Sequence, residues 1–285
     1  MDSEAARPDT GWRQALNPPI YLVSVLPGLG VPLLAQSYPG QGLGLLLATF
    51  AVVLLQHAIN LFNDAADWRL GADVEKFDSW VRVHAGQPRT AVVHGGLSLL
   101  AGGLLGLIVL WHLDQLWLLL VALPMVGLGY LYNAGARPLS YTWLGEWVTG
   151  ICYGPGVFGC LWLVAGFEVD AAMVAGMIAF ASLAVSLLLS HQPPQIETDR
   201  NAGKQSFAVR FGVPRTVFAA RLLFAVFIVA VVVAVVPQSP TPTAFVVGLV
   251  ALGALLFVYS GGVNPKRILL AASVFVCAGL LGTLL

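Results

Sequence analysis

Long apolar runs fill most of the chain and alternate with polar connections. The runs cover approximately residues 20–38, 42–61, 92–111, 115–133, 142–165, 170–191, 216–236, 241–259 and 267–285. Each is roughly 18 to 24 residues long, which is the length that an α-helix needs to cross a bilayer. The second and sixth connections are long and carry most of the charge, whereas the first, third, fifth and seventh are short. The pattern predicts an all-α integral membrane protein with nine transmembrane helices in one bundle.

Composition agrees with this prediction. Of the 285 residues, 58% are hydrophobic and only 10% are charged, whereas soluble domains carry about 25% charged residues. The formal net charge is zero, so nothing indicates a nucleic-acid partner, and membrane lipids are the expected surroundings. No linker or charge run divides the chain, and we expect a single domain over residues 1–285.

The basic residues predict an orientation in the membrane. All 14 lysines and arginines fall on one side of the nine-segment layout, and the opposite side holds only Asp114, Glu168 and Asp170. Because positive charge is retained on the cytoplasmic side, we expect the amino terminus and both long connections to be cytoplasmic. The carboxyl terminus would lie on the far side of the cell inner (plasma) membrane.

A polar patch ends the second apolar run. It consists of Asn60, Asn63, Asp64 and Asp67, followed by Gly71 and Asp73. The first four share one helical face, and Gly71 is a typical helix stop, which leaves Asp73 in the following loop. Carboxylate and amide oxygens in such a patch suit Mg²⁺, which is usually held by one or two carboxylates together with substrate phosphates.

A related patch ends the sixth run. Gln192, Gln195, Asp199 and Gly203 follow one another at the same spacing as Asn60, Asn63, Asp67 and Gly71. The chain therefore reads as an internal pseudo-repeat that presents a polar face twice, with a kink expected at Pro193 and Pro194. Arg200, Lys204 and Arg210 lie nearby and could neutralise a diphosphate.

Two such patches on one side of the membrane indicate a specific chemistry. Mg²⁺ that bridges a diphosphate stabilises it as a leaving group. Ionisation of an allylic diphosphate gives a carbocation, which an electron-rich carbon captures while the bundle excludes water. The rings of Tyr130, Tyr132, Tyr141 and Trp143 could stabilise that cation or anchor the membrane interface. Glu146 is open to structural pairing or catalysis, and His57 is best explained as a packed, hydrogen-bonded side chain.

The motifs resemble those of a known family. Residues 60–73 (NLFNDAADWRLGAD) resemble the first aspartate-rich motif of the UbiA superfamily of intramembrane aromatic prenyltransferases. The form is closest to the 1,4-dihydroxy-2-naphthoate branch of menaquinone synthesis. Residues 196–212 (IETDRNAGKQSFAVRFG), within a second motif region at 191–212, resemble the second motif. Segments between Tyr130 and Pro155 resemble the region from the fourth to the fifth helix of the same branch.

The resemblance implies a fold, a reaction and a set of site residues. It implies nine helices around a central cavity capped by two cytoplasmic loops, with Mg²⁺, a polyprenyl diphosphate donor and an aromatic acceptor as partners. Asp64, Asp67 and Asp199 would be catalytic, and together with Asn63 they would bind the metal. The remaining candidates for substrate binding are Asn60, Asp73, Arg82, Tyr132, Gln195, Arg200 and Lys204, besides Asn63. Gln195 stands where the second motif usually opens with an aspartate, which predicts a weaker second metal site.

Two alternatives to prenyl transfer remain open at this stage. A terpene cyclase of the same superfamily would capture the carbocation with a double bond of the substrate itself and would need no aromatic acceptor. A lipid-binding protein or transporter would perform no chemistry. Both polar patches, however, leave the membrane on the same side, and no charge is expected at the membrane midplane, where transporters place their sites.

Overall fold

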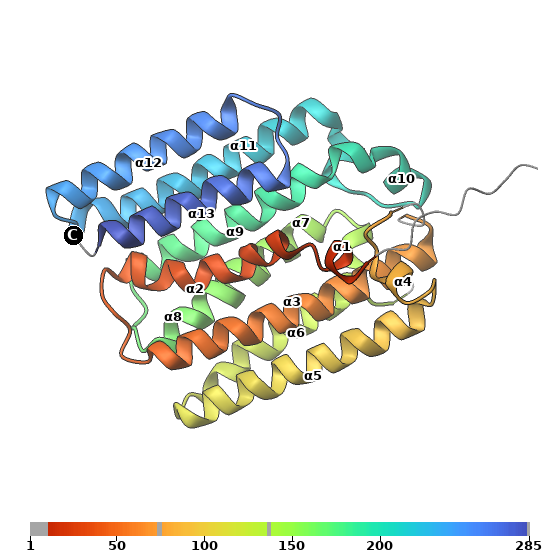
Figure 1. The fold of residues 1–285 in the computed structure, drawn as a ribbon, viewed down its shortest axis with the longest axis horizontal. Helices are drawn as coiled ribbons and strands as arrows, with labels where there is room; N and C mark the ends of the chain where they lie inside the picture. The colour runs from red at the N-terminus through yellow and green to blue at the C-terminus, as the bar shows by residue number, and fades with distance from the viewer. Residues whose placement is uncertain (1–10, 73–75, 136–137, 284–285) are drawn as a thin grey trace, which may run out of the picture.

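The computed structural model describes residues 11–72, 76–135 and 138–283, and all regular structure in these ranges is helical (Figure 1). Nine helical stretches among the described residues are long and apolar enough to cross a membrane, as predicted. They are Trp12–Ala35, Gly42–Leu70, Pro88–His112, Leu116–Asn133, Gly145–Val164, Ala171–His191, Phe207–Gln238, Thr241–Tyr259 and Pro265–Gly282. The fold is therefore an all-α membrane bundle.

Several of these stretches combine shorter elements. The helices are α1 (Trp12–Leu16), α2 (Leu22–Ala35), α3 (Gly42–Leu70), α4 (Trp80–Val83), α5 (Pro88–His112), α6 (Leu119–Asn133), α7 (Gly145–Ile151), α8 (Cys160–Val164), α9 (Ala171–His191), α10 (Ile196–Asn201), α11 (Phe207–Val235), α12 (Thr241–Tyr259) and α13 (Pro265–Gly282). A π-helical segment, Cys152–Gly159, joins α7 to α8. Short 3-10 turns cover Pro18–Tyr21, Leu116–Leu118, Leu139–Tyr141, Pro193–Gln195 and Val236–Gln238.

Helix α3 carries the first polar patch on its last turns. It continues well past the apolar run and ends at Gly71, which adopts a left-handed conformation (φ 83°) that few other residues tolerate. The predicted helix stop is thus confirmed, and the amide and carboxylate side chains project from one rigid element. Asp73 lies outside the described residues.

The second patch is less regular than the first. Helix α9 ends at His191, a 3-10 turn over Pro193–Gln195 follows, and Asp199 lies on the short α10. The break at the two prolines was predicted, and the side chains on either side of the turn have different partners, Glu146 for Gln192 and Lys204 for Asp199. Gly203 repeats the left-handed conformation of Gly71, with φ 75°.

Helix α11 begins earlier than its hydropathy indicates. The apolar run was placed at 216–236, yet helical structure starts at Phe207 and includes Arg210 and Arg215. A kink at Gly212 (φ 78°, ψ 169°), followed by Pro214, separates the first turn from the rest of the helix. Both arginines were expected in the sixth connection; the structure places Arg210 on the first turn of the helix, before the kink, and Arg215 just after it.

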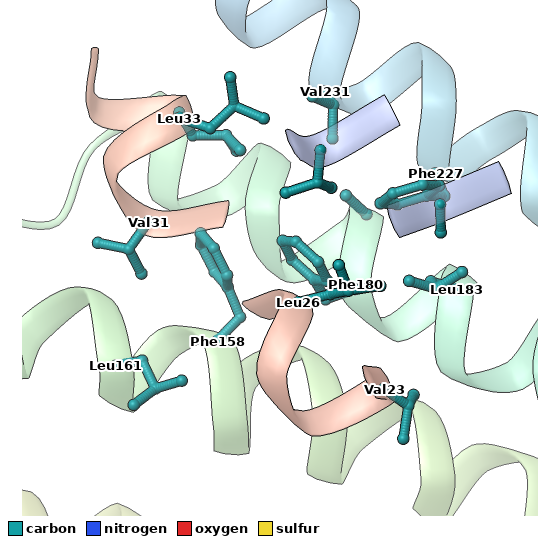
Figure 2. Close-up of a cluster of buried hydrophobic side chains, with 14 of the residues drawn as sticks. Val23, Leu26, Val31, Leu33, Phe158, Leu161, Phe180, Leu183, Phe227 and Val231 are labelled. Carbon is teal, nitrogen blue, oxygen red and sulfur yellow. The ribbon is translucent and has the colours of Figure 1, made fainter. Parts of the chain in front are cut away.

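The apolar core is built around α9 (Figure 2). The rings of Phe158 and Phe180 stack with centroids 5.1 Å apart, and Phe180 also contacts Phe227 of α11 at 5.8 Å. Gly176 makes this packing possible, because a Cβ there would lie 2.1 Å from the Phe158 ring. Helix α9 packs most extensively on α11, and α3 on α5.

The two long connections lie at the same end of the bundle. Figure 1 shows α4 and α10 at the same end of the bundle, opposite the last residues of α13. The amino-terminal α1 contacts α4 there, and Trp12 packs edge-on against Trp80 with centroids 5.3 Å apart. These short elements form a cap over the helix ends that carry the polar patches.

We expect the Gly176→Ala variant to be less stable than the wild type. The added methyl group would overpack the contact with Phe158, which typically destabilises by about 1–3 kcal/mol. Gly248→Ala is the matched control, since a Cβ at Gly248 on α12 meets nothing within 4 Å. Unfolding in mixed micelles measures both, and equal stability of the two variants would contradict the packing argument.

Candidate active site

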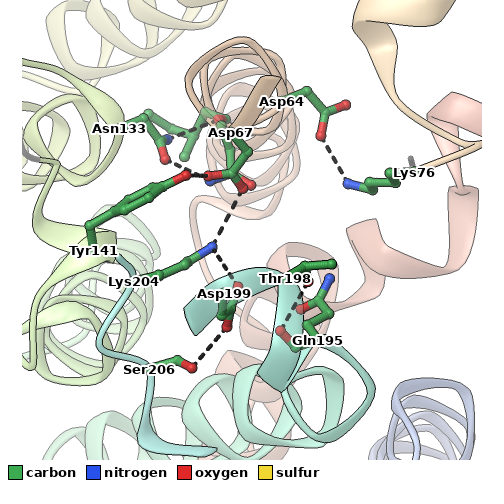
Figure 3. Close-up of polar contacts among 12 residues, drawn as sticks. Asp64, Asp67, Lys76, Asn133, Tyr141, Gln195, Thr198, Asp199, Lys204 and Ser206 are labelled. Carbon is green, nitrogen blue, oxygen red and sulfur yellow. Dashed lines mark hydrogen bonds and ion pairs between the residues drawn. The ribbon is translucent and has the colours of Figure 1, made fainter. Parts of the chain in front are cut away.

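Asp67 and Asp199 face one another across the mouth of the bundle. The Lys204 ammonium lies 3.5 Å from Asp67 Oδ2 and 3.8 Å from Asp199 Oδ1. Both aspartates are nearly fully buried, with 2% and 3% of their surface exposed. Figure 3 shows the three side chains directed toward a common point. The two patches therefore meet at a single cation, as they must if they are to share one ligand.

Local structure after α10 brings Lys204 to this position. Gly203 turns the chain in its left-handed conformation, and the Lys204 amide then donates a 2.8 Å hydrogen bond to the Asp199 carbonyl. The Ser206 hydroxyl donates to Asp199 Oδ2 at 2.8 Å. Asp199 is thus held through its backbone and its side chain by the residues that follow it.

Tyr141 holds the carboxylate of Asp67. Its hydroxyl donates to Asp67 Oδ1 at 2.8 Å, and the Lys204 ammonium lies 5.2 Å from the centre of its ring. Tyr141 is buried, so the ring makes a low-dielectric wall beside the charged groups. The sequence suggested Tyr141 as a cation-stabilising or interfacial ring, and this contact with Asp67 was missed because 74 residues separate the two.

Asp64 contacts the connection that follows α3. Lys76 approaches its Oδ1 at 2.9 Å, and the Trp80 amide at the start of α4 donates to Oδ2 at 2.7 Å. Figure 3 shows Asp64 turned toward Lys76 and away from the Lys204 cluster. One face of α3 therefore supplies two carboxylates, Asp64 for Lys76 and Asp67 for Lys204. Asp64 also holds the connection between α3 and α5 in place.

The amide side chains of α3 line the same end of the bundle. Asn63 donates to Asn133 Oδ1 at 2.9 Å, and Asn133 in turn donates to the Ile59 carbonyl at 3.1 Å. Asn133 is buried at the end of α6 and did not stand out in the sequence. It fixes the orientation of Asn63 on the side of α3 that faces α6.

The other candidate residues occupy varied positions. Tyr132 and Asn60 line the central cavity described below. The Arg82 guanidinium lies 5.9 Å from the ring centre of Trp68. Gln195 is half-buried in the 3-10 turn, where its carbonyl accepts a 3.0 Å hydrogen bond from Thr198, and Arg200 is exposed on α10.

Glu146 pairs with residues of two other helical segments, which is the structural alternative of the two considered above. Its carboxylate accepts hydrogen bonds from the Phe207 amide at 2.8 Å and from Gln192 at 3.1 Å. Arg210 approaches its other oxygen at 3.4 Å. These contacts join α7 to the end of α9 and the start of α11. Arg210 and Gln192 are thus engaged with Glu146 and not with Asp199.

An elongated apolar cavity begins beside the polar cluster. Its volume is about 360 Å³, and it follows α3 from Asn60 to Ala48, a distance of roughly 18 Å at the rise of an α-helix. Glycines of α5, including Gly102 and Gly106, contribute to its walls. An elongated apolar site with a polar mouth suits a ligand that has a charged head and a hydrocarbon tail.

The donor atoms at the mouth suit a hard divalent cation. Carboxylate and amide oxygens are the ligands that Mg²⁺ prefers, and the two aspartates already converge on a cation in the form of Lys204. Among the described residues, no three His, Cys, Asp or Glu side chains lie close enough to hold a metal without rearrangement. The chemistry of the residues thus fits Mg²⁺, with Lys204 standing where the carboxylates converge.

Comparison with known proteins identifies the family. A model of the UbiA prenyltransferase family matches residues 22–281, which include both polar patches and all but the ends of the chain. The chain belongs to the UbiA prenyltransferase family. The 1,4-dihydroxy-2-naphthoate octaprenyltransferase of Bacillus subtilis is 29% identical over 244 residues, which are 83% of this chain and 77% of that protein. The enzyme of the same description from Mycobacterium tuberculosis is 33% identical over 210 residues, 72% of this chain and 70% of that one.

Solved structures share the fold. A UbiA homolog from Aeropyrum pernix in its apo form aligns with a TM-score of 0.67 at 19% identity, covering 93% of this chain and 98% of that one. A UbiA homolog from Archaeoglobus fulgidus, bound to DMAPP and Mg²⁺, aligns with a TM-score of 0.62 at 18% identity, covering 96% and 99%. At these identities the likeness concerns the architecture of the bundle.

Replacement of Tyr141 by phenylalanine tests the geometry of the mouth. The variant loses the hydrogen bond to the buried Asp67 carboxylate. We expect its free energy of unfolding to fall by about 1.5–3 kcal/mol. Tyr38→Phe is the control, because Tyr38 is 79% exposed. Titration with a denaturing detergent compares the two, and a Tyr141→Phe protein as stable as Tyr38→Phe would refute the assigned contact.

Proposed function

We propose that this protein transfers a polyprenyl group from its diphosphate to an aromatic acceptor, 1,4-dihydroxy-2-naphthoate, in quinone biosynthesis. The observation that carries the proposal is the meeting of Asp67 and Asp199 at one cation, beside the mouth of an elongated apolar cavity. Family membership supports prenyl transfer, and the descriptions of the Bacillus and Mycobacterium relatives support the naphthoate acceptor.

The donor would lie with its hydrocarbon chain in the cavity and its diphosphate at the mouth. Lys204 and Lys76 already contact the carboxylates there and would neutralise the phosphates. Asn60 and Tyr132 line the cavity, and we assign them to the substrate. Arg82, Gln195 and Arg200 are proposed as outer contacts of the diphosphate. Asp73, outside the described residues, is proposed to face the metal or the acceptor.

Asn63, Asp64, Asp67 and Asp199 would hold Mg²⁺. The hard-oxygen chemistry of these side chains supports this assignment, as does the A. fulgidus homolog, which is described as bound to Mg²⁺. When bound, the metal would supply positive charge to the departing diphosphate. Gln195 offers an amide where a further carboxylate is usual in the family, so the number of metal ions is expected to be set by the first patch.

The protein's own residues account for the remaining steps. The donor C–O bond breaks, and its electron pair leaves with the diphosphate, which Lys204 attracts. The apolar cavity walls exclude water from the allylic cation, and the Tyr132 ring can stabilise it. A ring carbon of the acceptor then forms the new C–C bond. Tyr141 keeps the Asp67 carboxylate in place throughout.

The arrangement in the cell is part of the proposal. We propose that residues 1–285 form a single domain in the cell inner membrane. The amino terminus and the connections that carry α4 and α10 would lie in the cytoplasm. The location of both connections at one end of the bundle supports placing them on the same side of the membrane (Figure 1), and the distribution of basic residues supports the cytoplasmic side.

The double variant Asp64→Asn, Asp67→Asn is expected to lose prenyl transfer by about a hundredfold or more, because charge stabilisation at the leaving group is removed. Transfer from labelled polyprenyl diphosphate to 1,4-dihydroxy-2-naphthoate is followed by thin-layer chromatography. Asp114→Asn is the control, since Asp114 is exposed in the connection between α5 and α6, where its φ of 55° also suits asparagine.

Full transfer by the double variant would overturn the proposed site. Incubation of the wild type with donor alone separates transfer from cyclisation. Release of diphosphate with a cyclic hydrocarbon product, and no product that contains the naphthoate, would favour a terpene cyclase over the proposed transferase.

Filling the cavity should shorten the accepted donor. Gly106 lines the cavity, and a Cβ there meets only Ala51, at 3.9 Å, so a leucine side chain would occupy space meant for the prenyl chain. We expect Gly106→Leu to retain activity with short donors and to lose it with long ones. Gly96→Leu, at an exposed position of the same helix with open space around it, is the control. Unchanged chain-length preference in Gly106→Leu would place the prenyl chain elsewhere.

A further inference from the structure

A chain of four ring side chains runs alongside the active site without belonging to it. The Tyr21 hydroxyl lies 2.6 Å from His57 Nδ1. His57 Nε2 lies 3.4 Å from His94 Nε2, and His94 Nδ1 lies 3.2 Å from His84 Nε2. The four residues come from the turn before α2, from α3, from α5 and from the end of α4. Ionisable residues in membrane helices are rare and usually functional.

One end of this chain lies beside the cavity. Asn60 lies close to the Tyr21 hydroxyl, and Asn60 lines the cavity at its polar mouth. Asp64 is near enough to Tyr21 to act on it electrostatically. An acceptor bound at the mouth of the cavity would therefore have the Tyr21 hydroxyl within its immediate surroundings.

The other end of the chain leaves the membrane. His84 follows α4 and lies outside the nine membrane-spanning stretches. The next two residues, Ala85 and Gly86, are exposed. Together the four side chains connect the interior of the bundle with the aqueous surface at the capped end.

Two tryptophans pack against the middle of this series of four side chains. Trp80 is 2% exposed, and its ring meets His57 and His94 edge-on, with centroids 5.0 and 5.3 Å apart. Trp12 approaches His94 at 5.5 Å. Trp80 thus covers one side of His57 and His94, both of which stay partly exposed, and the hydrogen-bonded imidazoles offer a proton a continuous path through this region.

All the hydrogen bonds in this series can point the same way, from Tyr21 towards His84 or from His84 towards Tyr21. In one arrangement, Tyr21 donates to His57 Nδ1, and a neutral His57 then carries its hydrogen on Nε2 and donates it to His94. His94 then carries its hydrogen on Nδ1 and donates to His84 Nε2. Three neutral imidazoles satisfy every contact in this order, and they also satisfy every contact in the reverse order. A hydrogen-bonded chain with two equivalent polarities can pass a proton from end to end.

We propose that Tyr21, His57, His94 and His84 carry away the proton that the hydroxyl group of the aromatic acceptor loses during prenyl transfer; this rests on the function proposed above. As the donor C–O bond breaks and the ring carbon forms its C–C bond, the acceptor O–H bond breaks and its electron pair stays on oxygen, which becomes a carbonyl. The proton passes to Tyr21 while Tyr21 passes its own to His57. The shift continues through His94, and a proton leaves His84 for water.

Replacement of His94 by glutamine tests the relay at its centre. Glutamine retains hydrogen-bonding atoms but cannot exchange a proton in this way. We expect kcat for transfer to the hydroxynaphthoate to fall about a hundredfold, while KM for donor and acceptor stays within twofold. In His94→Gly, added imidazole should restore turnover. His112→Gln is the matched control, since His112 ends the same helix at the opposite end of the bundle and is exposed.

The outcomes separate the relay from the function on which it rests. Normal kcat in His94→Gln, or a raised KM with unchanged kcat, would overturn the relay while prenyl transfer by the wild type stands. Failure of imidazole to rescue a correctly folded His94→Gly protein, as judged by its unfolding temperature, would also overturn it. A wild type that transfers no prenyl group to the hydroxynaphthoate would overturn the proposed function and the relay together.

Discussion

The arrangement depends on the contact of two buried carboxylates with one ammonium group. At the low effective dielectric of a protein interior, the attraction among Asp67, Asp199 and Lys204 is strong, but the loss of hydration is also large. Such a cluster persists only where the geometry is well supported by further hydrogen bonds. Tyr141 and Ser206 provide this support, and the cluster in turn holds the two halves of the chain in register at the mouth of the cavity.

The remaining acids at this end of the bundle act in a similar way. Asp64 accepts hydrogen bonds from Lys76 and the Trp80 amide, and Glu146 accepts them from Gln192 and the Phe207 amide. In both cases a carboxylate on a membrane-spanning stretch binds residues in or just after one of the two long connections. The cap is therefore organised by side chains of the bundle, which explains how short elements such as α4 and α10 keep fixed positions above an apolar core.

A polar end and an apolar interior divide the tasks of the site. The cavity along α3 can accept a hydrocarbon chain and exclude water, while the charged groups remain at the mouth. The chain from Tyr21 to His84 adds a third component at the same mouth, which is a route for protons past the tryptophan rings. Each component includes side chains of α3, and this helix is their common support.

The sequence alone determined the nine spans, the two polar patches and the helix stop at Gly71, because bilayer thickness, helical periodicity and the freedom of glycine act over a few turns of chain. It could not reveal that Tyr141 holds Asp67, that Asn133 orients Asn63, or that three histidines from α3, α4 and α5 meet. It also placed the start of α11 too late. Only tertiary structure decided these points, since contacts between residues far apart in the chain depend on how helices pack and where turns such as Pro193–Gln195 redirect them.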